Sequence, residues 1–504
     1  MNPLKKLASQ TAIYGLSSVV GRLLNYLLVP LYTRYFLPEE YGVVTELYAY
    51  VAFLVIILTY GIETAFFRFS QKEKNNRIVY STSLISLLFS SLLFIILMFV
   101  FSENISSSIG YPNNQEYIKW FALIIGLDAI SSISFAKLRA LNKATRFALI
   151  RLVNIFVNIG LNLFFIIYCP YAIENNLQSL NFVNSVYSPS VGVGYIFIAN
   201  LFASVITILM LLPEMINSVW VFERNLWKKM MIYASPLLIA GLAGMTNETI
   251  DRILLKYLLP ESSNISREIG LYGAFYKLSI IMILFIQTFR FAAEPFYFSQ
   301  EREHNSRKIY ADVMKYFIIV TSFIFLIVTT FYDFFINFLG SKYHDERGFL
   351  VVSILLFANF FLGIYYNLSI WYKLTEKTKY GAYIAIFGAS ITIILNFLLI
   401  PILGFVGSAL ATLACYFFMV LVSFYLSNKY FPIPYNYYRI LMYFFLMIFI
   451  YLIIYYTNFS LILDILFLVG YCLLVYALEK PKMTDNKTPC LLYTSDAADE
   501  EASV

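Results

Sequence analysis

Charged side chains are scarce in this chain of 504 residues. Asp, Glu, Lys and Arg together make up 13% of it, whereas soluble domains average about 25%. Apolar residues make up 60%. Because so little charge cannot cover the surface of a soluble protein of this length, the composition indicates an integral membrane protein. The net charge of +6 lies in the connections between apolar stretches, so it does not indicate a nucleic-acid partner.

Histidine and cysteine are rarer still. The two histidines, His304 and His344, fall on opposite sides of the membrane in the topology derived below. Cys169, Cys415 and Cys472 are isolated within or beside apolar stretches. We therefore expect neither a metal site nor a disulfide framework. The chain also lacks a P-loop and a recognisable cleavable signal peptide, and we predict no cofactor.

Fourteen long apolar stretches account for most of the chain. Each is at least as long as the roughly 17–25 residues that cross about 30 Å of hydrocarbon as a helix. The sequence therefore predicts an all-α polytopic membrane protein with about 14 transmembrane helices. The stretches cover residues 10–35, 41–66, 78–102, 115–137, 147–169, 190–213, 231–258, 270–297, 313–338, 349–371, 380–401, 403–427, 437–456 and 459–478.

Lysine and arginine alternate between the connections of these stretches. Every second connection, beginning with the N-terminal segment, is rich in them, and the other connections hold few. Because cationic loops stay in the cytoplasm, we expect both termini there. The cation-rich side holds Lys5, Lys6, Arg68, Lys72, Lys74, Arg77, Lys137, Arg139, Lys143, Arg146, Arg224, Lys228, Lys229, Arg302, Arg307, Lys308, Lys315, Lys373, Lys377, Lys379, Lys429, Arg439, Lys480, Lys482 and Lys487.

The chain also repeats itself at an offset near 222 residues. Lys5-Lys6 matches Lys228-Lys229, and Gly42 matches Gly270. Further matches join Arg34, Pro38 and Glu39 to Lys256, Pro260 and Glu261, and residues 69–71 to residues 298–300. Six stretches separate the copies, so both have the same orientation. This predicts two parallel six-helix lobes, 1–222 and 223–430, around a central cavity. The two extra C-terminal helices occupy 431–480, and a cytoplasmic tail covers 481–489.

The last residues do not resemble the rest of the chain. Residues 490–500 read CLLYTSDAADE, which is similar to a translated sequencing adapter. We interpret 490–504 as an artefact and expect the natural C-terminus to be missing. The alternative is a genuine acidic tail.

Three segments resemble a known family. Residues 32–42 (YTRYFLPEEYG) resemble the junction of spans 1 and 2 in bacterial polysaccharide (O-antigen-type) flippases of the multidrug/oligosaccharidyl-lipid/polysaccharide exporter (MOP) superfamily. Residues 269–278 (IGLYGAFYKL) are similar to the start of their span 8. Residues 396–401 (NFLLIP), followed by Gly404 and Gly407, resemble their hairpin of spans 11 and 12. The chain departs from the family at Leu410, where a second small residue is usual.

The resemblance covers essentially residues 1–480 and implies a function. It implies a flippase that moves oligosaccharide on a polyprenyl phosphate or pyrophosphate from the inner to the outer leaflet of the bacterial cytoplasmic (inner) membrane. The pathway would be the biosynthesis of lipopolysaccharide or another polysaccharide, with a glycan polymerase and chain-length machinery as partners besides membrane lipids. It also implies coupling to a H⁺ or Na⁺ gradient.

Cations inside the stretches are the candidate substrate site. A charge facing lipid costs about 2.5–3.5 kcal/mol at the bilayer centre on insertion scales, whereas in a cavity it can bind the phosphate of a carrier lipid. Amides spaced by three or four residues lie on one helix face and suit sugar hydroxyls. The predicted head-group residues are Arg22, Arg151, Lys277, Arg290, Asn25, Asn154 and Asn158. The open alternatives are an Arg22–Asp128 pair, hydrogen bonds between helices for the amides, and snorkelling for Arg151.

Carboxylates inside the stretches are the candidates for ion or proton coupling. They are Asp128, Asp251, Glu46, Glu63 and Glu294. The spacing of four residues also predicts ion pairs between Glu248 and Arg252 and between Arg290 and Glu294. For Glu248, Asp251 and Arg252 a structural ion pair between the lobes is the alternative.

Three other functions remain alternatives. A drug or cation exporter of the same superfamily and a lipid II-type flippase share the predicted layout. A membrane glycan polymerase is less consistent with the sequence, because such an enzyme needs a charged active site. The longest outer connection, 170–189, holds one acid, Glu174, and no Lys or Arg.

Overall fold

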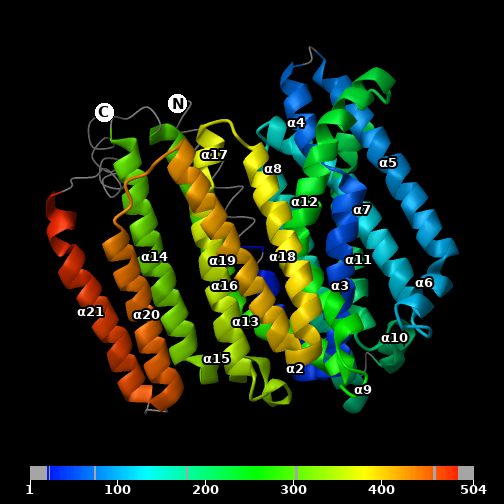
Figure 1. Ribbon diagram of the computed structural model, residues 1–504. Coiled ribbons are helices and arrows are strands. Elements are labelled where there is room, and N and C mark those ends of the chain that lie inside the picture. Colours follow the sequence, from blue (N-terminus) through cyan, green and yellow to red (C-terminus); the bar gives the residue numbers. More distant parts are fainter. Residues whose placement is uncertain are drawn as a thin grey trace, which may run out of the picture. The chain divides into compact units, whose positions relative to one another are not determined.

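The protein is described by a computed structural model that covers residues 20–21, 23–72, 75–177, 180–300, 305–457 and 461–485. All elements of these residues are helices (Figure 1). The first half of the chain forms α2 (Leu28–Tyr35), α3 (Pro38–Thr59), α4 (Ile62–Lys72), α5 (Asn76–Val100), α6 (Ser102–Ser108), α7 (Gln115–Ala140), α8 (Ala144–Leu163), η1 (Phe164–Tyr168), α9 (Cys169–Glu174), α10 (Leu180–Val186), η2 (Pro189–Val191) and α11 (Gly194–Ile216). The second half forms α12 (Arg224–Leu258), α13 (Ile265–Gln300), α14 (Ser306–Thr330), α15 (Tyr332–Leu339), η3 (Ser341–Tyr343), α16 (Gly348–Leu368), α17 (Ile370–Leu374), α18 (Lys379–Leu403), α19 (Phe405–Tyr430), α20 (Tyr437–Thr457) and α21 (Leu461–Asp485).

The prediction of an all-α polytopic membrane protein is confirmed. The described residues contain 13 helical segments that are long and apolar enough to cross a membrane. They correspond in order to the second to fourteenth predicted stretches. Residues 10–19 and 22 of the first predicted stretch, 10–35, lie outside the described residues, and the end of the stretch forms α2. Residues 486–504, which include the predicted artefact, also lie outside them.

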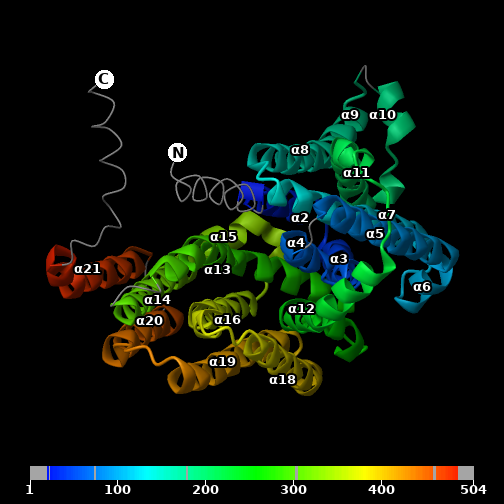
Figure 2. The same ribbon diagram turned by 90° about the horizontal axis from the view of Figure 1, so that it is seen from above.

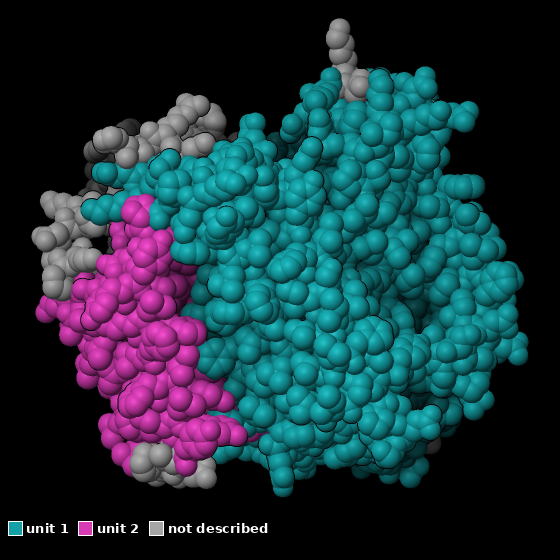
Figure 3. All heavy atoms as spheres, in the orientation of Figure 1, with its two compact units in different colours: residues 1–310, 333–433 teal, residues 311–332, 434–504 magenta. Residues whose placement is uncertain are grey.

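The chain divides into two compact units, coloured separately in Figure 3. Unit 1 comprises Met1–Tyr310 and Asp333–Ile433, and unit 2 comprises Ala311–Tyr332 and Pro434–Val504. Unit 1 contains most helices of both predicted lobes. Unit 2 combines α14 with α20 and α21. The predicted domain boundaries at 222, 430 and 480 do not coincide with this division and stay predictions.

Unit 2 is held by an ion cluster on one carboxylate. Glu479 of α21 accepts hydrogen bonds from Lys315 Nζ of α14 at 2.7 Å and from Arg439 Nη1 of α20 at 2.8 Å. The Tyr443 hydroxyl of α20 donates to the same carboxylate at 2.8 Å. The side chains of Lys315 and Glu479 are each only 3% exposed. Because a buried carboxylate needs such partners, this cluster ties the three helices together.

The α18–α19 hairpin shows why the NFLLIP segment folds as it does. Gly404 joins the two helices with a φ of 60°, a left-handed conformation that favours glycine. A Cβ at Gly407 would lie 2.5 Å from the Leu399 carbonyl oxygen, so the helices can approach only with glycine there. The Ser408 hydroxyl donates to Asn396 Oδ1 at 2.6 Å and satisfies that buried amide.

Candidate substrate cavity

The two halves of unit 1 meet along α3, which packs against α12 and α13 (Figure 2). At the start of α3 the contact is between backbones. A Cβ at Gly42 would lie 2.0 Å from the Ser266 carbonyl oxygen, and a Cβ at Gly270 would lie 1.8 Å from the Pro38 carbonyl oxygen. Each glycine therefore faces the carbonyl four residues before the other. Such a reciprocal contact is the pattern of a two-fold axis, and it supports the repeat that matched Gly42 with Gly270.

Polar contacts continue this helix contact along one face of α3. We call it the seam, formed by Glu39, Gly42, Glu46 and Tyr50 of α3 with Arg267 and Gly270 of α13 and Lys256 and Tyr257 of α12. Glu39 pairs with Arg267 at 3.6 Å, and Glu46 pairs with Lys256 at 2.8 Å. The Tyr50 and Tyr257 hydroxyls lie 3.1 Å apart. The seam therefore joins the two halves for three turns of α3.

A cavity of about 430 Å³ lies between the two halves beside the seam. Its walls come from α2, α3, α8 and α11 on one side and from α12 and α13 on the other. A second hollow of about 300 Å³ shares Asn25, Glu248 and Lys277 with it and reaches Gln287. The polar side chains that line the first cavity are Asn25, Tyr32, Tyr41, Thr45, Tyr48, Asn154, Asn158, Asn200, Glu248, Thr249, Arg252, Tyr276 and Lys277.

The structure brings four of the seven predicted head-group residues to this cavity. Asn25, Asn154, Asn158 and Lys277 all line it. Asn154 also donates to the Thr207 hydroxyl at 3.0 Å, so the expected amide face of α8 serves both the cavity and a helix contact. Asn158 Oδ1 accepts from Asn162 at 3.0 Å. The predicted amide face of α8 therefore lines the cavity, and neighbouring side chains orient its amides.

The cations of the cavity differ in their partners. No hydrogen bond or ion pair joins the Lys277 ammonium to any side chain of the described ranges, and this side chain is only partly buried. The Arg252 guanidinium lies over the Tyr276 ring at 4.1 Å and 3.7 Å from Asp251. It donates to the backbone carbonyl of Glu248 at 2.9 Å and not to its carboxylate, so the predicted Glu248–Arg252 ion pair is replaced by a pair with Asp251.

The other predicted cations lie elsewhere. Arg151 is exposed and lies over the Phe135 ring at 4.1 Å. Arg290 forms the expected pair with Glu294 at 3.9 Å and lines a small separate hollow beside Lys373. Arg22 lies outside the described residues, so its pairing with Asp128 stays a prediction.

The candidate coupling carboxylates have well-defined partners. Glu46 is buried, with Lys256 and the Tyr111 hydroxyl on it. Asp251 is buried and accepts from the Tyr272 hydroxyl at 2.5 Å. Glu63 pairs with Arg139, and Glu294 pairs with Lys373 at 2.9 Å. Asp128 is exposed and accepts from the Ser204 hydroxyl at 2.8 Å.

Sequence reasoning did not select Asn200, Tyr48 or Glu248 for the cavity. Asn200 donates to the Tyr48 hydroxyl at 3.0 Å and lines the cavity together with Asn154 and Asn158 of α8. It is a lone amide in its span, so no series of amides indicates a polar face there as it does in α8. The spacing of Glu248 and Arg252 predicts only an ion pair for Glu248. Among the described residues no group of three His, Cys, Asp or Glu side chains could hold a metal ion.

The groups that line the cavity suit the binding of an anion and of hydroxyl groups. An ammonium and a guanidinium attract phosphate oxygens, and amides and hydroxyls exchange hydrogen bonds with sugar hydroxyls. Among the described residues that line this cavity, Glu248 alone carries a carboxylate.

The profile of the family described as polysaccharide biosynthesis protein matches residues 7–300, more than half of the chain. No curated protein sequence matches significantly.

Solved structures are similar over most of the chain. The lipid II flippase MurJ in an inward closed conformation is 17% identical, with a TM-score of 0.70, over 93% of this chain and 99% of that one. A multidrug resistance MATE family transporter of the MOP superfamily in an inward-facing conformation is 14% identical, with a TM-score of 0.63, over 81% and 95%. A MOP superfamily transporter from Pyrococcus furiosus is 14% identical, with a TM-score of 0.55, over 83% and 95%. At these identities the likeness concerns the fold.

Proposed function

The chain belongs to the polysaccharide biosynthesis protein family, and we propose that it is a flippase for oligosaccharide linked to polyprenyl phosphate or pyrophosphate. It would carry this lipid from the inner to the outer leaflet of the bacterial cytoplasmic membrane by alternating access, in lipopolysaccharide (O-antigen) or other polysaccharide biosynthesis. The observation that carries the proposal is the Lys277 ammonium, which faces a cavity between the two halves without a protein partner in the described chain.

An unpaired ammonium in a membrane protein favours an anionic ligand. Its desolvation is unfavourable unless an opposite charge approaches, and the phosphate of a carrier lipid supplies that charge. Arg252 adds a second cation, and Asn25, Asn154, Asn158 and Asn200 add hydrogen-bonding groups for sugars. The cavity of about 430 Å³ holds the head group and the nearest sugars, while the polyprenyl tail stays in lipid.

The seam supplies the closed gate of the transport cycle. With the cation-rich connections in the cytoplasm, the seam lies at the outer end of the cavity. The state described here then separates the cavity from the outer leaflet. Release of the glycan requires α3 to move away from α12 and α13, which a rocking motion of two parallel lobes achieves.

Coupling to H⁺ or Na⁺ is part of the proposal. Asp128 is the best placed of the predicted carboxylates, because it is exposed and has a neutral hydroxyl partner, Ser204. Glu46, Glu63 and Glu294 are each in an ion pair. Collapsing both gradients should stop net transport in proteoliposomes, and undiminished transport would remove coupling from the proposal.

The central test is a transbilayer assay with a matched pair of variants. Reconstituted protein should move a polyprenyl-pyrophosphate-linked oligosaccharide, and Lys277→Gln should slow this at least about tenfold, because a hydrogen bond to a charged group is worth about 1.5–3 kcal/mol. Arg290→Gln removes the same charge outside the cavity and should stay within about twofold.

Two outcomes would contradict the proposal. Lys277→Gln at the wild-type rate and equal membrane abundance would remove this lysine from substrate binding. Movement of a cationic dye, with no movement of the lipid-linked glycan by inserted wild type, would favour the drug or cation exporter.

A further inference from the structure

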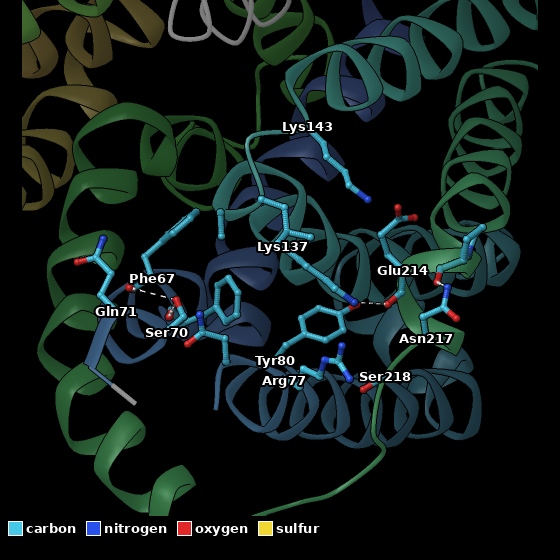
Figure 4. Close-up of a pocket in the computed structure, with 15 residues that line it drawn as sticks. Phe67, Ser70, Gln71, Arg77, Tyr80, Lys137, Lys143, Glu214, Asn217 and Ser218 are labelled. Atoms are coloured by element: carbon cyan, nitrogen blue, oxygen red, sulfur yellow. Dashed lines mark hydrogen bonds between the residues drawn. The ribbon is translucent and has the colours of Figure 1, made fainter. Parts of the chain in front are cut away.

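A second, larger cavity of about 670 Å³ lies within the N-terminal half of unit 1 (Figure 4). We call it the basic pocket. Its walls come from the end of α4, the start of α5 and the ends of α7 and α11. It shares no lining residue with the central cavity. The basic pocket is therefore a separate place to look for a ligand.

Three cations line the basic pocket, and one carboxylate faces them. The cations are Arg77, Lys137 and Lys143, and the carboxylate is Glu214. Lys137 and Lys143 point toward Glu214 in Figure 4. The carboxylate is already paired with Arg146 outside the lining, at 3.0 Å. The charge that remains in the pocket is therefore positive.

Lys137 is held in place by the protein itself. Its ammonium donates to the Glu214 backbone carbonyl at 2.7 Å and lies 3.9 Å from the centre of the Tyr80 ring. These contacts fix one cation at the wall of the pocket without neutralising it, since a carbonyl and an aromatic ring carry no net charge. A pre-oriented cation of this kind binds an anion with little loss of side-chain entropy.

Arg77 and Lys143 are available to a ligand. Both are exposed, and neither the Arg77 guanidinium nor the Lys143 ammonium has a hydrogen bond or ion pair to another described residue. The N-terminus of α5 also faces the pocket, where Asn76 lines it. Because the first N–H groups of a helix attract anions, this end adds to the field of the side chains.

The remaining lining combines polar and apolar groups. Ser70, Gln71, Asn217 and Ser218 provide hydrogen-bonding groups, whereas Phe66, Phe67 and Pro213 provide apolar surface. The volume falls in the range of about 300–1,000 Å³ that is typical of ligand pockets. The pocket also lies where four membrane-spanning segments end, at the level where lipid head groups are found.

We propose that the basic pocket binds a phosphate-bearing ligand through Arg77, Lys137 and Lys143. The ligand chemistry is a phosphate mono- or diester, which either the head group of an anionic phospholipid of the adjoining leaflet or a soluble phosphate can supply. The site does not depend on the proposed transport function, because no lining residue belongs to the central cavity.

The test uses the full-length protein in an uncharged detergent. Native mass spectrometry should show bound short-chain phosphatidylglycerol and little phosphatidylcholine. Arg77→Gln combined with Lys143→Gln should weaken this binding at least about tenfold, since two charge-assisted contacts are lost. A parallel titration with inorganic phosphate and pyrophosphate alone, read as a shift of the unfolding temperature, tests the soluble source.

A matched control removes the same charge nearby. Lys228→Gln combined with Lys229→Gln replaces two exposed lysines at the start of α12, outside the pocket. This variant should bind the lipid within about twofold of the wild type. Lipid bound only by wild type and control assigns the site to a phospholipid. A temperature shift by phosphate that only the Arg77/Lys143 variant loses assigns it to a soluble phosphate. Equal binding by all three proteins in both assays overturns the proposal. So does the absence of both a preference for the anionic lipid and a temperature shift by phosphate.

Discussion

At the scale of single residues, Glu46 has partners in space that its position in the sequence does not reveal. It lies in the middle of α3, is 1% exposed, and is bonded to Lys256 of α12. The Tyr111 hydroxyl, from the connection before α7, donates to it at 2.5 Å. A carboxylate so buried is stable only with these partners, so it links three parts of the chain.

We expect Glu46→Gln to destabilise the protein by roughly 3–5 kcal/mol, because the Lys256 ammonium, whose side chain is only 17% exposed, would lose its counter-charge. Adding Lys256→Met to Glu46→Gln should restore part of this loss. SDS-induced unfolding of the single and double variants measures the coupling as a double-mutant cycle. Glu116→Gln, an exposed change in α7, is the control. Additive single effects would mean that the two residues do not interact.

Asp345 gives a prediction about pH. Arg347 donates to both oxygens of its carboxylate and also to Glu268 of α13. These hydrogen bonds lower the pKa of Asp345 below its usual value. A carboxyl whose pKa is lower in the folded protein stabilises it above the unfolded pKa of about 3.9, and this contribution is lost as the pH falls through the folded pKa.

We therefore expect the unfolding temperature of the wild type to fall more steeply than that of Asp345→Asn as the pH drops below about 4. At pH 7 the wild type should be the more stable of the two. Thermal unfolding in detergent across this pH range measures the difference. Parallel curves for the two proteins would show that the Asp345 carboxylate contributes nothing to stability.

At the scale of elements, the contact of α3 with α13 is set by two glycines. Gly42 and Gly270 bring the helix backbones so close that a Cβ on either would overlap a carbonyl oxygen of the other helix. Neither carbonyl can move independently of its helix, because each belongs to a hydrogen-bonded turn. The closed seam is therefore available only with glycine at both positions.

We expect Gly42→Ala or Gly270→Ala to push the seam open and to slow transport, while insertion stays normal. Spin labels at Leu37→Cys and Ser262→Cys, both exposed positions near the seam, should report a longer distance in either variant. Gly244→Ala in α12 meets no atom within 4 Å and should leave the distance unchanged. An unaltered distance in the Gly42 and Gly270 variants would contradict the role given to these glycines.

At the scale of the whole molecule, the distribution of lysine and arginine predicts the orientation in the membrane. The connections at the two ends of α13 then lie on opposite sides, with Ser262 outside and Asn305 in the cytoplasm. The two residues flank the same long helix, α13. The orientation of every other span follows from this pair.

With the native cysteines replaced by serine, we expect a membrane-impermeant maleimide to label Ser262→Cys in intact cells. Asn305→Cys should be labelled only after the cells are opened. The reverse pattern would place both termini outside and would also move the seam to the cytoplasmic end of the cavity. Labelling of both positions in intact cells would mean a mixed topology.

The amino-acid sequence by itself determined the fold class, the order of the spans and the equivalence of Gly42 and Gly270 in the repeat. These follow from local properties, since an apolar stretch of sufficient length forms a membrane helix whatever its neighbours, and a repeat is visible in the chain itself. Helical spacing also selected the amide face of α8, because residues three or four apart share a face.

Only the tertiary structure decided which polar faces meet. Lys277 and Asn154 are 123 positions apart in the sequence and yet line one cavity. Arg290 belongs to the same helix as Lys277 but lines a different hollow, together with Glu294 and Lys373. Asp251 pairs with Arg252, and Glu46 pairs with Lys256 from a different helix. Such contacts are determined by how packed helices are rotated and how closely they approach each other. Rotation and approach depend on the fit of side chains from segments that are far apart in the sequence.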